Sequence, residues 1–220
     1  MTQKDLCATF DHTLLNPLAT QEAIRQLCRE AAEWQFATVC VNSSYVLEAS
    51  QLLKGEAVGV CAVAGFPLGA DTTRTKQAQA RQAVEDGASE IDMVLNLGWV
   101  KDQRWAELEA EIKAVCDAAC VPVKVILETC YLTDAEIVKA CHLSENAGAF
   151  MVKTSTGWGP GGATPESVRL MRSSVSPRML VKASGGIRSL ATCLVMLDAG
   201  ASRIGSSSSV AIIKEFAYEH

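Results

Sequence analysis

Short apolar runs rich in β-branched residues alternate along the whole chain with longer segments that mix apolar and polar residues. Each run has the length of a buried strand, and each longer segment has room for a helix. The apolar runs predict eight strands, at residues 7–10, 36–41, 58–63, 90–95, 121–127, 150–153, 179–182 and 203–204.

Helix signals stand between these runs. Residues 72–85 are rich in Ala, Gln, Arg and Lys, which favour helix. Thr133 is followed three residues later by Glu136, the spacing of a capping box. Thr164 precedes Pro165, which suits the first position of a capped helix. These signals place helix starts directly ahead of the mixed segments.

A weak internal repeat supports the alternation. Asp86-Gly87-Ala88, Ala147-Gly148-Ala149 and Ala199-Gly200-Ala201 each end a helical pattern and lead into an apolar run. Glycine at such a point suits the left-handed residue that ends many helices. Regular strand and helix alternation without a compositional break predicts one parallel-sheet domain over residues 1–220, a single (β/α)8 barrel of the TIM type. An open doubly wound sheet is the alternative, and the first strand lacks its G-x-G-x-x-G turn.

Composition narrows the classes of function. The chain has 220 residues, of which 49% are hydrophobic, and its net charge is −5, so it can bury a large core but lacks the basic face of a nucleic-acid binder. No apolar run has the length of a membrane span or a signal peptide. The nine cysteines form no C-x-x-C pair, and most stand in apolar runs. We therefore expect reduced thiols, a cytoplasmic location and no contact with membranes or nucleic acids.

Charged residues interrupt or end several predicted strands. Parallel strands are covered on both faces, so a charge within one needs a partner or a function. In a barrel of this type the strand ends and the loops after them carry the chemistry. The residues in question are Asp11, Asp92, Lys124, Glu128, Lys153 and Lys182.

Two lysines stand in nearly equivalent settings. Lys153 and Lys182 each end a strand and precede a loop that contains glycine. On neighbouring strands, about 4.8 Å apart, their ammonium groups would repel each other. Repulsion and burial both favour a neutral amine, which could attack a carbonyl and form a Schiff base. The alternative is that both lysines bind phosphate as cations.

Loops after the last two strands suit an anion. Gly185 and Gly186 follow the seventh strand, and Gly205 with Ser207 and Ser208 follows the eighth. Glycines let main-chain N–H groups approach a phosphate, and hydroxyl groups add neutral donors. Phosphate often binds at this place in such barrels.

The strand order places Lys124 between Asp92 and Lys153. An aspartate and lysine pair here could be structural, or could hold a water that moves protons, with Glu128 as the next candidate. His12 is expected just past the first strand, where it would make a local hydrogen bond rather than act as a base.

At this point the sequence resembles the deoxyribose-phosphate aldolase family. The motifs that carry the resemblance run in order along nearly the whole chain: Asp11-His12-Thr13-Leu14-Leu15, Gly65-Phe66-Pro67-Leu68-Gly69, Glu90-Ile91-Asp92-Met93-Val94, Val152-Lys153-Thr154-Ser155-Thr156-Gly157, Val181-Lys182-Ala183-Ser184-Gly185-Gly186-Ile187-Arg188 and Arg203-Ile204-Gly205. Trp158 stands where Phe is usual, and Ser206 and Ser209 stand where Thr and Gly are frequent.

The resemblance implies a class I aldolase that needs no metal or other cofactor. It would cleave 2-deoxy-D-ribose 5-phosphate reversibly to glyceraldehyde 3-phosphate and acetaldehyde. The roles it implies are imine formation for Lys153, a cationic neighbour for Lys182 and proton relay for Asp92. It also implies substrate or phosphate binding by Gly157, Gly185, Gly186, Gly205, Ser207, Ser208, Lys124, Asp11 and Cys40.

Two other functions remain open at this stage. A phosphosugar isomerase on the same barrel would use Asp92 as base and the lysines only as stabilising charges. A phosphosugar-binding protein without activity would not need a buried lysine pair. The expected partners are small phosphosugars and aldehydes, together with further copies of the chain in a dimer or tetramer.

Overall fold

Eight parallel strands form a closed barrel in the computed structural model, which describes residues 1–219. Each strand pairs with its neighbours in sequence, and β1 also pairs with β8, so the sheet has no edge. The strands are β1 (Phe10–Leu14), β2 (Thr38–Val41), β3 (Gly59–Ala64), β4 (Glu90–Val94), β5 (Val123–Ile126), β6 (Met151–Lys153), β7 (Leu180–Ser184) and β8 (Arg203–Ser206). This closure confirms the (β/α)8 barrel and excludes the open sheet.

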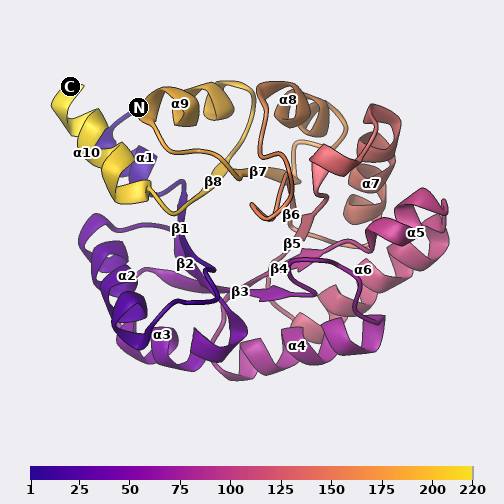
Figure 1. Cartoon of the computed structure of the whole chain (residues 1–220), viewed down its shortest axis with the longest axis horizontal. Helices are drawn as coiled ribbons and strands as arrows, with labels where there is room; N and C mark the ends of the chain where they lie inside the picture. The colour runs from indigo at the N-terminus through magenta and orange to yellow at the C-terminus, as the bar shows by residue number, and fades with distance from the viewer. Residues whose placement is uncertain (220) are drawn as a thin grey trace.

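Helices surround the barrel as an outer ring, as the view in Figure 1 shows. They are α1 (Gln3–Cys7), α2 (Gln21–Trp34), α3 (Val46–Leu52), α4 (Thr73–Glu85), α5 (Leu97–Lys101), α6 (Trp105–Ala119), α7 (Asp134–Asn146), α8 (Pro165–Ser173), α9 (Leu190–Asp198) and α10 (Ser209–Glu219). Two 3-10 turns, η1 (Ser43–Tyr45) and η2 (Thr129–Tyr131), follow β2 and β5. The short α1 packs beside α10, so the two ends of the chain meet on one side.

The helix signals in the sequence operate as predicted. Thr133 and Glu136 form the reciprocal hydrogen bonds of a capping box at the start of α7. Thr164 caps α8, which begins with Pro165. The glycines of the internal repeat have positive φ: 104° at Gly87, 86° at Gly148 and 107° at Gly200.

The first strand differs from the prediction. Residues 7–10 were expected, but the strand is Phe10–Leu14. Cys7 instead ends the helix α1, which begins with a capping box formed by Thr2 and Asp5. His12 therefore lies within β1, and its Nε2 is 2.9 Å from Glu30 Oε2. The strand carries polar residues because partners from other elements contact them, so hydropathy alone did not reveal it.

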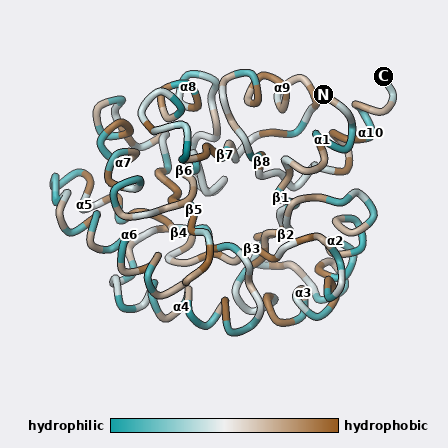
Figure 2. Tube along the Cα trace, turned by 180° about the vertical axis from the view of Figure 1, so that it is seen from behind, coloured by the Kyte–Doolittle hydropathy of each residue, from teal (hydrophilic) through white to brown (hydrophobic). Residues whose placement is uncertain are grey.

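The two faces of each strand carry different kinds of side chain. Outward residues such as Val39, Val60 and Val125 join the apolar layer under the helices. The helices turn apolar residues toward this layer, and in α2 these include Ile24 and Leu27. Figure 2 shows apolar and polar residues alternating along the helices. The inward positions hold most of the charged residues that the sequence singled out. Among residues 1–219, no helix is long and apolar enough to cross a membrane.

Candidate active site

A cavity of about 340 Å³ lies at the carboxyl ends of the strands. Its walls come from the loops after β1, β6, β7 and β8, as expected for a barrel of this type. The lining residues are Thr13, Leu14, Leu15, Asn16, Lys153, Thr156, Gly157, Trp158, Ser184, Gly185, Gly186, Ile187, Arg188, Gly205, Ser206 and Ser207.

Asp92 lies below this cavity at the centre of three lysines. Its Oδ2 atom is 2.7 Å from the Lys153 Nζ and 2.8 Å from the Lys182 Nζ. Its Oδ1 atom is 2.8 Å from the Lys124 Nζ. Strand register explains the arrangement, because Asp92 pairs with Lys124 on β5, and Lys153 pairs with Lys182 across β6 and β7.

A second carboxylate completes the network deeper in the barrel. Asp11 Oδ2 is 2.5 Å from the Lys182 Nζ, and its Oδ1 is 2.6 Å from a guanidinium nitrogen of Arg203. Glu90 contacts Lys124 at 2.6 Å and Arg203 at 3.3 Å. Three carboxylates, of Asp11, Glu90 and Asp92, thus face four cations, of Lys124, Lys153, Lys182 and Arg203.

The network holds most of its members in their charged forms. Burial alone would raise the pKa of Asp92, but Lys124, Lys153 and Lys182 together hold that pKa well below its ordinary value. Burial would likewise lower the pKa of Lys182, yet Asp11 and Asp92 raise it above its ordinary value. Asp92 therefore stays an anion and Lys182 a cation at neutral pH.

Lys153 is the lysine of the network that is accessible from the cavity. Lys124 and Lys182 have fully buried side chains, whereas Lys153 lines the cavity and is 3% exposed. The sequence predicted repulsion between Lys153 and Lys182, and the structure adds the Asp92 carboxylate, which attracts both. A molecule in the cavity can therefore contact Lys153, whereas neither Lys124 nor Lys182 lines the cavity.

The two glycines after β7 line the cavity with left-handed backbone. Gly185 has φ +88° and Gly186 has φ +81°, and a Cβ on Gly186 would meet nothing within 4 Å. Ser207 also lines the cavity. This open backbone leaves room for an anion to approach main-chain donors.

Arg188 is a lining residue that the predicted set of binding residues left out. It is exposed and stands in the quoted motif after Gly185-Gly186, which was the available signal. It adds a positive charge at the same side of the cavity as the glycines.

The predicted binding residues fall into two groups. Gly157, Gly185, Gly186, Gly205 and Ser207 line the cavity. The other four do not line it. Lys124, Asp11 and Cys40 are fully buried below the cavity, and the N–H of Ser208 donates to Ser206 Oγ at 2.9 Å.

Glu128 has a function that the sequence did not reveal. Its backbone is left-handed, with φ 55°, and its buried carboxylate accepts hydrogen bonds from the N–H and the hydroxyl of Thr156. The Thr156 hydroxyl oxygen in turn accepts from the N–H of Trp158 at 3.0 Å. Glu128 therefore holds the loop that forms one wall of the cavity.

Two residues that depart from the common motif are accommodated. Ser209 is buried at the start of α10, and its hydroxyl donates to the Ser206 carbonyl at 3.0 Å. Trp158 is 55% exposed at the rim of the cavity.

Comparisons with known proteins agree with one another. A family model described as DeoC/LacD family aldolase matches residues 6–213. Deoxyribose-phosphate aldolase of Carboxydothermus hydrogenoformans is 54% identical over 210 residues, which are 93% of this chain and 92% of that one.

Solved structures are similar as well. A protein from Coccidioides immitis has a crystal structure that matches with a TM-score of 0.96 and 44% identity, covering 99% of this chain and 87% of that one. The tetrameric deoxyribose phosphate aldolase of Aeropyrum pernix matches with a TM-score of 0.90 and 36% identity, covering 100% and 94%.

Proposed function

Because the chain belongs to the DeoC/LacD family of aldolases, we propose that Lys153 forms the Schiff base through which it works. The enzyme cleaves 2-deoxy-D-ribose 5-phosphate reversibly to glyceraldehyde 3-phosphate and acetaldehyde. Its relatives do not favour the alternative of an isomerase.

The charge balance of the buried network is the observation that carries this proposal. With all groups ionised, three carboxylates face four cations and leave one excess positive charge in the barrel. Buried excess charge is costly, so the network gains if one cation loses its proton. Lys153 is the lysine of the network that a substrate in the cavity can contact, because it lines the cavity. A neutral Lys153 amine is the nucleophile that imine formation needs.

The reaction then uses the residues around Lys153. The Lys153 amine attacks the carbonyl carbon of the open-chain sugar, and water leaves as the iminium forms. The iminium accepts the electron pair of the breaking carbon–carbon bond, which releases glyceraldehyde 3-phosphate and leaves an enamine on Lys153. Protonation of the enamine carbon and hydrolysis release acetaldehyde and restore the amine.

Asp92 and Lys182 would move the protons that these steps require. Asp92 lies 2.7 Å from the Lys153 Nζ and can hand a proton to or from it through short hydrogen bonds. Lys182 contacts the same oxygen at 2.8 Å, so its fixed positive charge supports the anionic form of Asp92. Lys124 supports it from the other oxygen.

The phosphate of the substrate would bind at the wall formed by Gly185, Gly186 and Ser207. Main-chain N–H groups and a hydroxyl supply neutral donors there, and Arg188 supplies a charge. Gly157, Gly205 and Ser208 complete the proposed contacts.

Reductive trapping tests the role of Lys153. Acetaldehyde and borohydride should convert the Lys153 amine into an ethylamine, which trypsin no longer cleaves. The digest should then contain residues 140–169 as one modified peptide in place of a cut after Lys153. Lys153→Arg keeps the charge but not the nucleophile, and should take up no label. Label confined to Lys124 or Lys182 would contradict the assignment, and neither an isomerase nor a simple binding protein would be labelled.

We further propose that the chain works as one aldolase domain, as a homo-oligomer in the cytoplasm. The Aeropyrum pernix relative is tetrameric. Light scattering of the purified protein should give a mass that is a multiple of 23.5 kDa, with a dimer or tetramer expected.

A further inference from the structure

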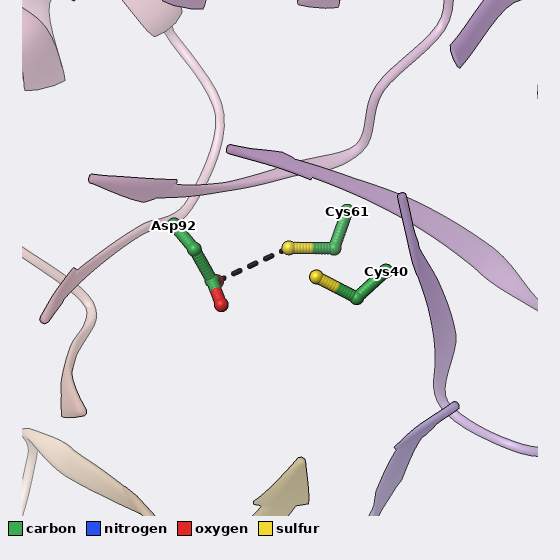
Figure 3. Close-up of side chains that lie close together, drawn as sticks. All are labelled: Cys40, Cys61 and Asp92. Atoms are coloured by element: carbon green, nitrogen blue, oxygen red, sulfur yellow. Dashed lines mark hydrogen bonds between the residues drawn. The ribbon is translucent and has the colours of Figure 1, made fainter. Parts of the chain in front are cut away.

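Two cysteines lie side by side inside the barrel, in a place that the proposed reaction does not use. Cys40 on β2 and Cys61 on β3 are register partners, and both are fully buried. Figure 3 shows both side chains pointing toward Asp92. Their sulfur atoms and a carboxylate oxygen of Asp92 all lie within 4.8 Å of one another.

The geometry of this pair suits a disulfide bond. Paired residues on neighbouring strands have Cα atoms roughly 4.8 Å apart, and disulfides span Cα distances of about 4.4 to 6.8 Å. Small side-chain rotations could therefore join the two sulfur atoms without breaking the strand pairing. We propose that Cys40 and Cys61 are an oxidation site, which forms an internal disulfide when a small hydroperoxide enters the barrel.

A metal ion fits the same residues less well. The Lys124 Nζ already lies 3.2 Å from Cys61 Sγ and 2.8 Å from Asp92 Oδ1, in the position where a cation would bind these two ligands. Lys153 and Lys182 would also repel a divalent ion from Asp92. A disulfide carries no charge, so it avoids this conflict.

The oxidation balances with hydroperoxide as the only added reactant. The Cys40 thiolate attacks one peroxide oxygen, so that an S–O bond forms, the O–O bond breaks, and the departing oxygen takes up the thiol proton and leaves as water from hydrogen peroxide, or as an alcohol from an alkyl hydroperoxide. The Cys61 sulfur then attacks the Cys40 sulfur, which forms the S–S bond and releases water with the Cys61 proton. Two thiols are oxidised and one peroxide is reduced.

The environments of the two thiols favour Cys40 as the first to react. The neighbouring Cys61 side chain lowers the pKa of Cys40, and Lys182 and Lys153 lower it further, against burial and the Asp92 carboxylate, which raise it. Burial, by contrast, raises the pKa of Cys61 well above its ordinary value. A lower pKa means more thiolate, the form that attacks peroxide.

The cysteine pair adjoins the active-site cavity through one shared neighbour, Leu15. Leu15, Val63 and Phe66 pack around the two cysteines as a small apolar cluster, separate from the main core. Leu15 also lines the cavity, so this cluster lies directly against the cavity wall. Leu15 is 9% and Val63 8% exposed, which shows that water reaches the cluster itself.

Oxidation at this site would remove a hydrogen bond from Asp92. The Cys61 thiol donates a hydrogen bond to Asp92 Oδ1 at 3.1 Å and accepts one from Lys124 at 3.2 Å. A disulfide has no thiol proton, so Asp92 loses a donor and the carboxylate is free to shift toward the lysines. Turnover should fall, an effect that rests on the proposed function of Asp92, whereas disulfide formation itself does not depend on it.

Peptide mapping tests the proposal on the intact enzyme. Trypsin releases Cys40 in residues 30–54 and Cys61 in residues 55–74, each with one cysteine. After hydrogen peroxide treatment and thiol blocking, we expect these two peptides joined, with a mass lower by two hydrogen atoms than their sum. Activity should fall in proportion to the joined fraction and return with dithiothreitol. Absence of the joined peptides, or full activity in protein that is fully joined, would overturn the proposal.

Two variants separate this pair from the other cysteines. Cys61→Ala should leave Cys40 without a partner, so the joined peptides disappear, together with the dithiothreitol-reversible part of the activity loss. Cys141→Ala removes an equally buried thiol on α7, and the link should still form. An equal reversible loss in Cys61→Ala would assign the effect to another cysteine and contradict the proposal. Borohydride trapping at Lys153 in untreated enzyme tests the proposed function independently.

Discussion

The ammonium nitrogens of Lys153 and Lys182 contact one and the same atom, Oδ2 of Asp92, at 2.7 and 2.8 Å. The two lysines are register partners, but their surroundings differ. Lys182 is also held by Asp11 at 2.5 Å and is fully buried, whereas Lys153 lines the cavity. One lysine of the pair is therefore held as a buried cation, and the other is accessible from the cavity.

Asp92→Asn should lower turnover by ~10² or more, the range expected for a general acid–base group. The amide keeps the shape but cannot take a proton from Lys153. Exchange of deuterium into the acetaldehyde methyl group should fall together with cleavage of the sugar. Near-normal exchange would place the proton relay elsewhere. Glu90→Gln is the matched control, because Glu90 contacts Lys124 and Arg203 rather than Lys153, and its effect should be smaller.

Lys182→Met should slow imine formation at neutral pH and recover in part at alkaline pH. Removal of this cation takes away the excess positive charge, so the network no longer gains when one of its cations loses a proton. Lys182→Arg keeps the charge and should retain more of the normal pH dependence. The measurement is the rate of imine formation against pH in both variants. Equal slowing of Lys182→Met at every pH would mean that Lys182 donates a proton or binds substrate directly.

Gly186→Val should raise KM for the phosphorylated sugar much more than for free deoxyribose. The added side chain would enter the open space of the cavity where the phosphate is proposed to bind. Valine at positive φ is strained wherever it stands, so a matched control is needed. Gly148→Val supplies it, because Gly148 has φ +86° and open space but does not line the cavity. Equal losses on both substrates would indicate general damage to the fold.

Asp11→Asn should show a stability loss that depends on pH. Burial disfavours the Asp11 carboxylate, but Lys182, Lys124 and Arg203 outweigh burial and lower its pKa. The stabilisation is therefore present above the unfolded-chain value of about 3.9 and is lost as pH falls below it. Urea unfolding should give a lower free energy of unfolding for Asp11→Asn at pH 7, with a gap to the parent that narrows below about pH 4.

A gap of constant size at every pH would show that Asp11 contributes through shape or neutral hydrogen bonds. Asp117→Asn is the exposed control, since Asp117 pairs with Lys113 on the surface of α6. Exposed pairs of this kind contribute little, so its stability should stay near that of the parent.

Local patterns in the sequence were enough to predict the barrel and to single out the strand ends that carry Lys153 and Lys182. Apolar runs, helix caps such as Thr133 and Thr164, and glycines at helix ends are signals between residues close in sequence, which act before any distant contact forms. They predicted the order of strands and helices, and with it the end of the barrel at which Lys153 would lie.

Contacts between distant strands were decided only by tertiary structure. β1 contains Asp11 and His12, which are stable in a strand because Lys182, Arg203 and Glu30 reach them from far along the chain. Barrel closure and strand register, set by packing of the whole sheet, likewise placed Asp92 between the lysines and Cys40 beside Cys61. A charge or a thiol in a sequence has no partner until the fold supplies one, so the pairs that govern reactivity here follow from the closed barrel.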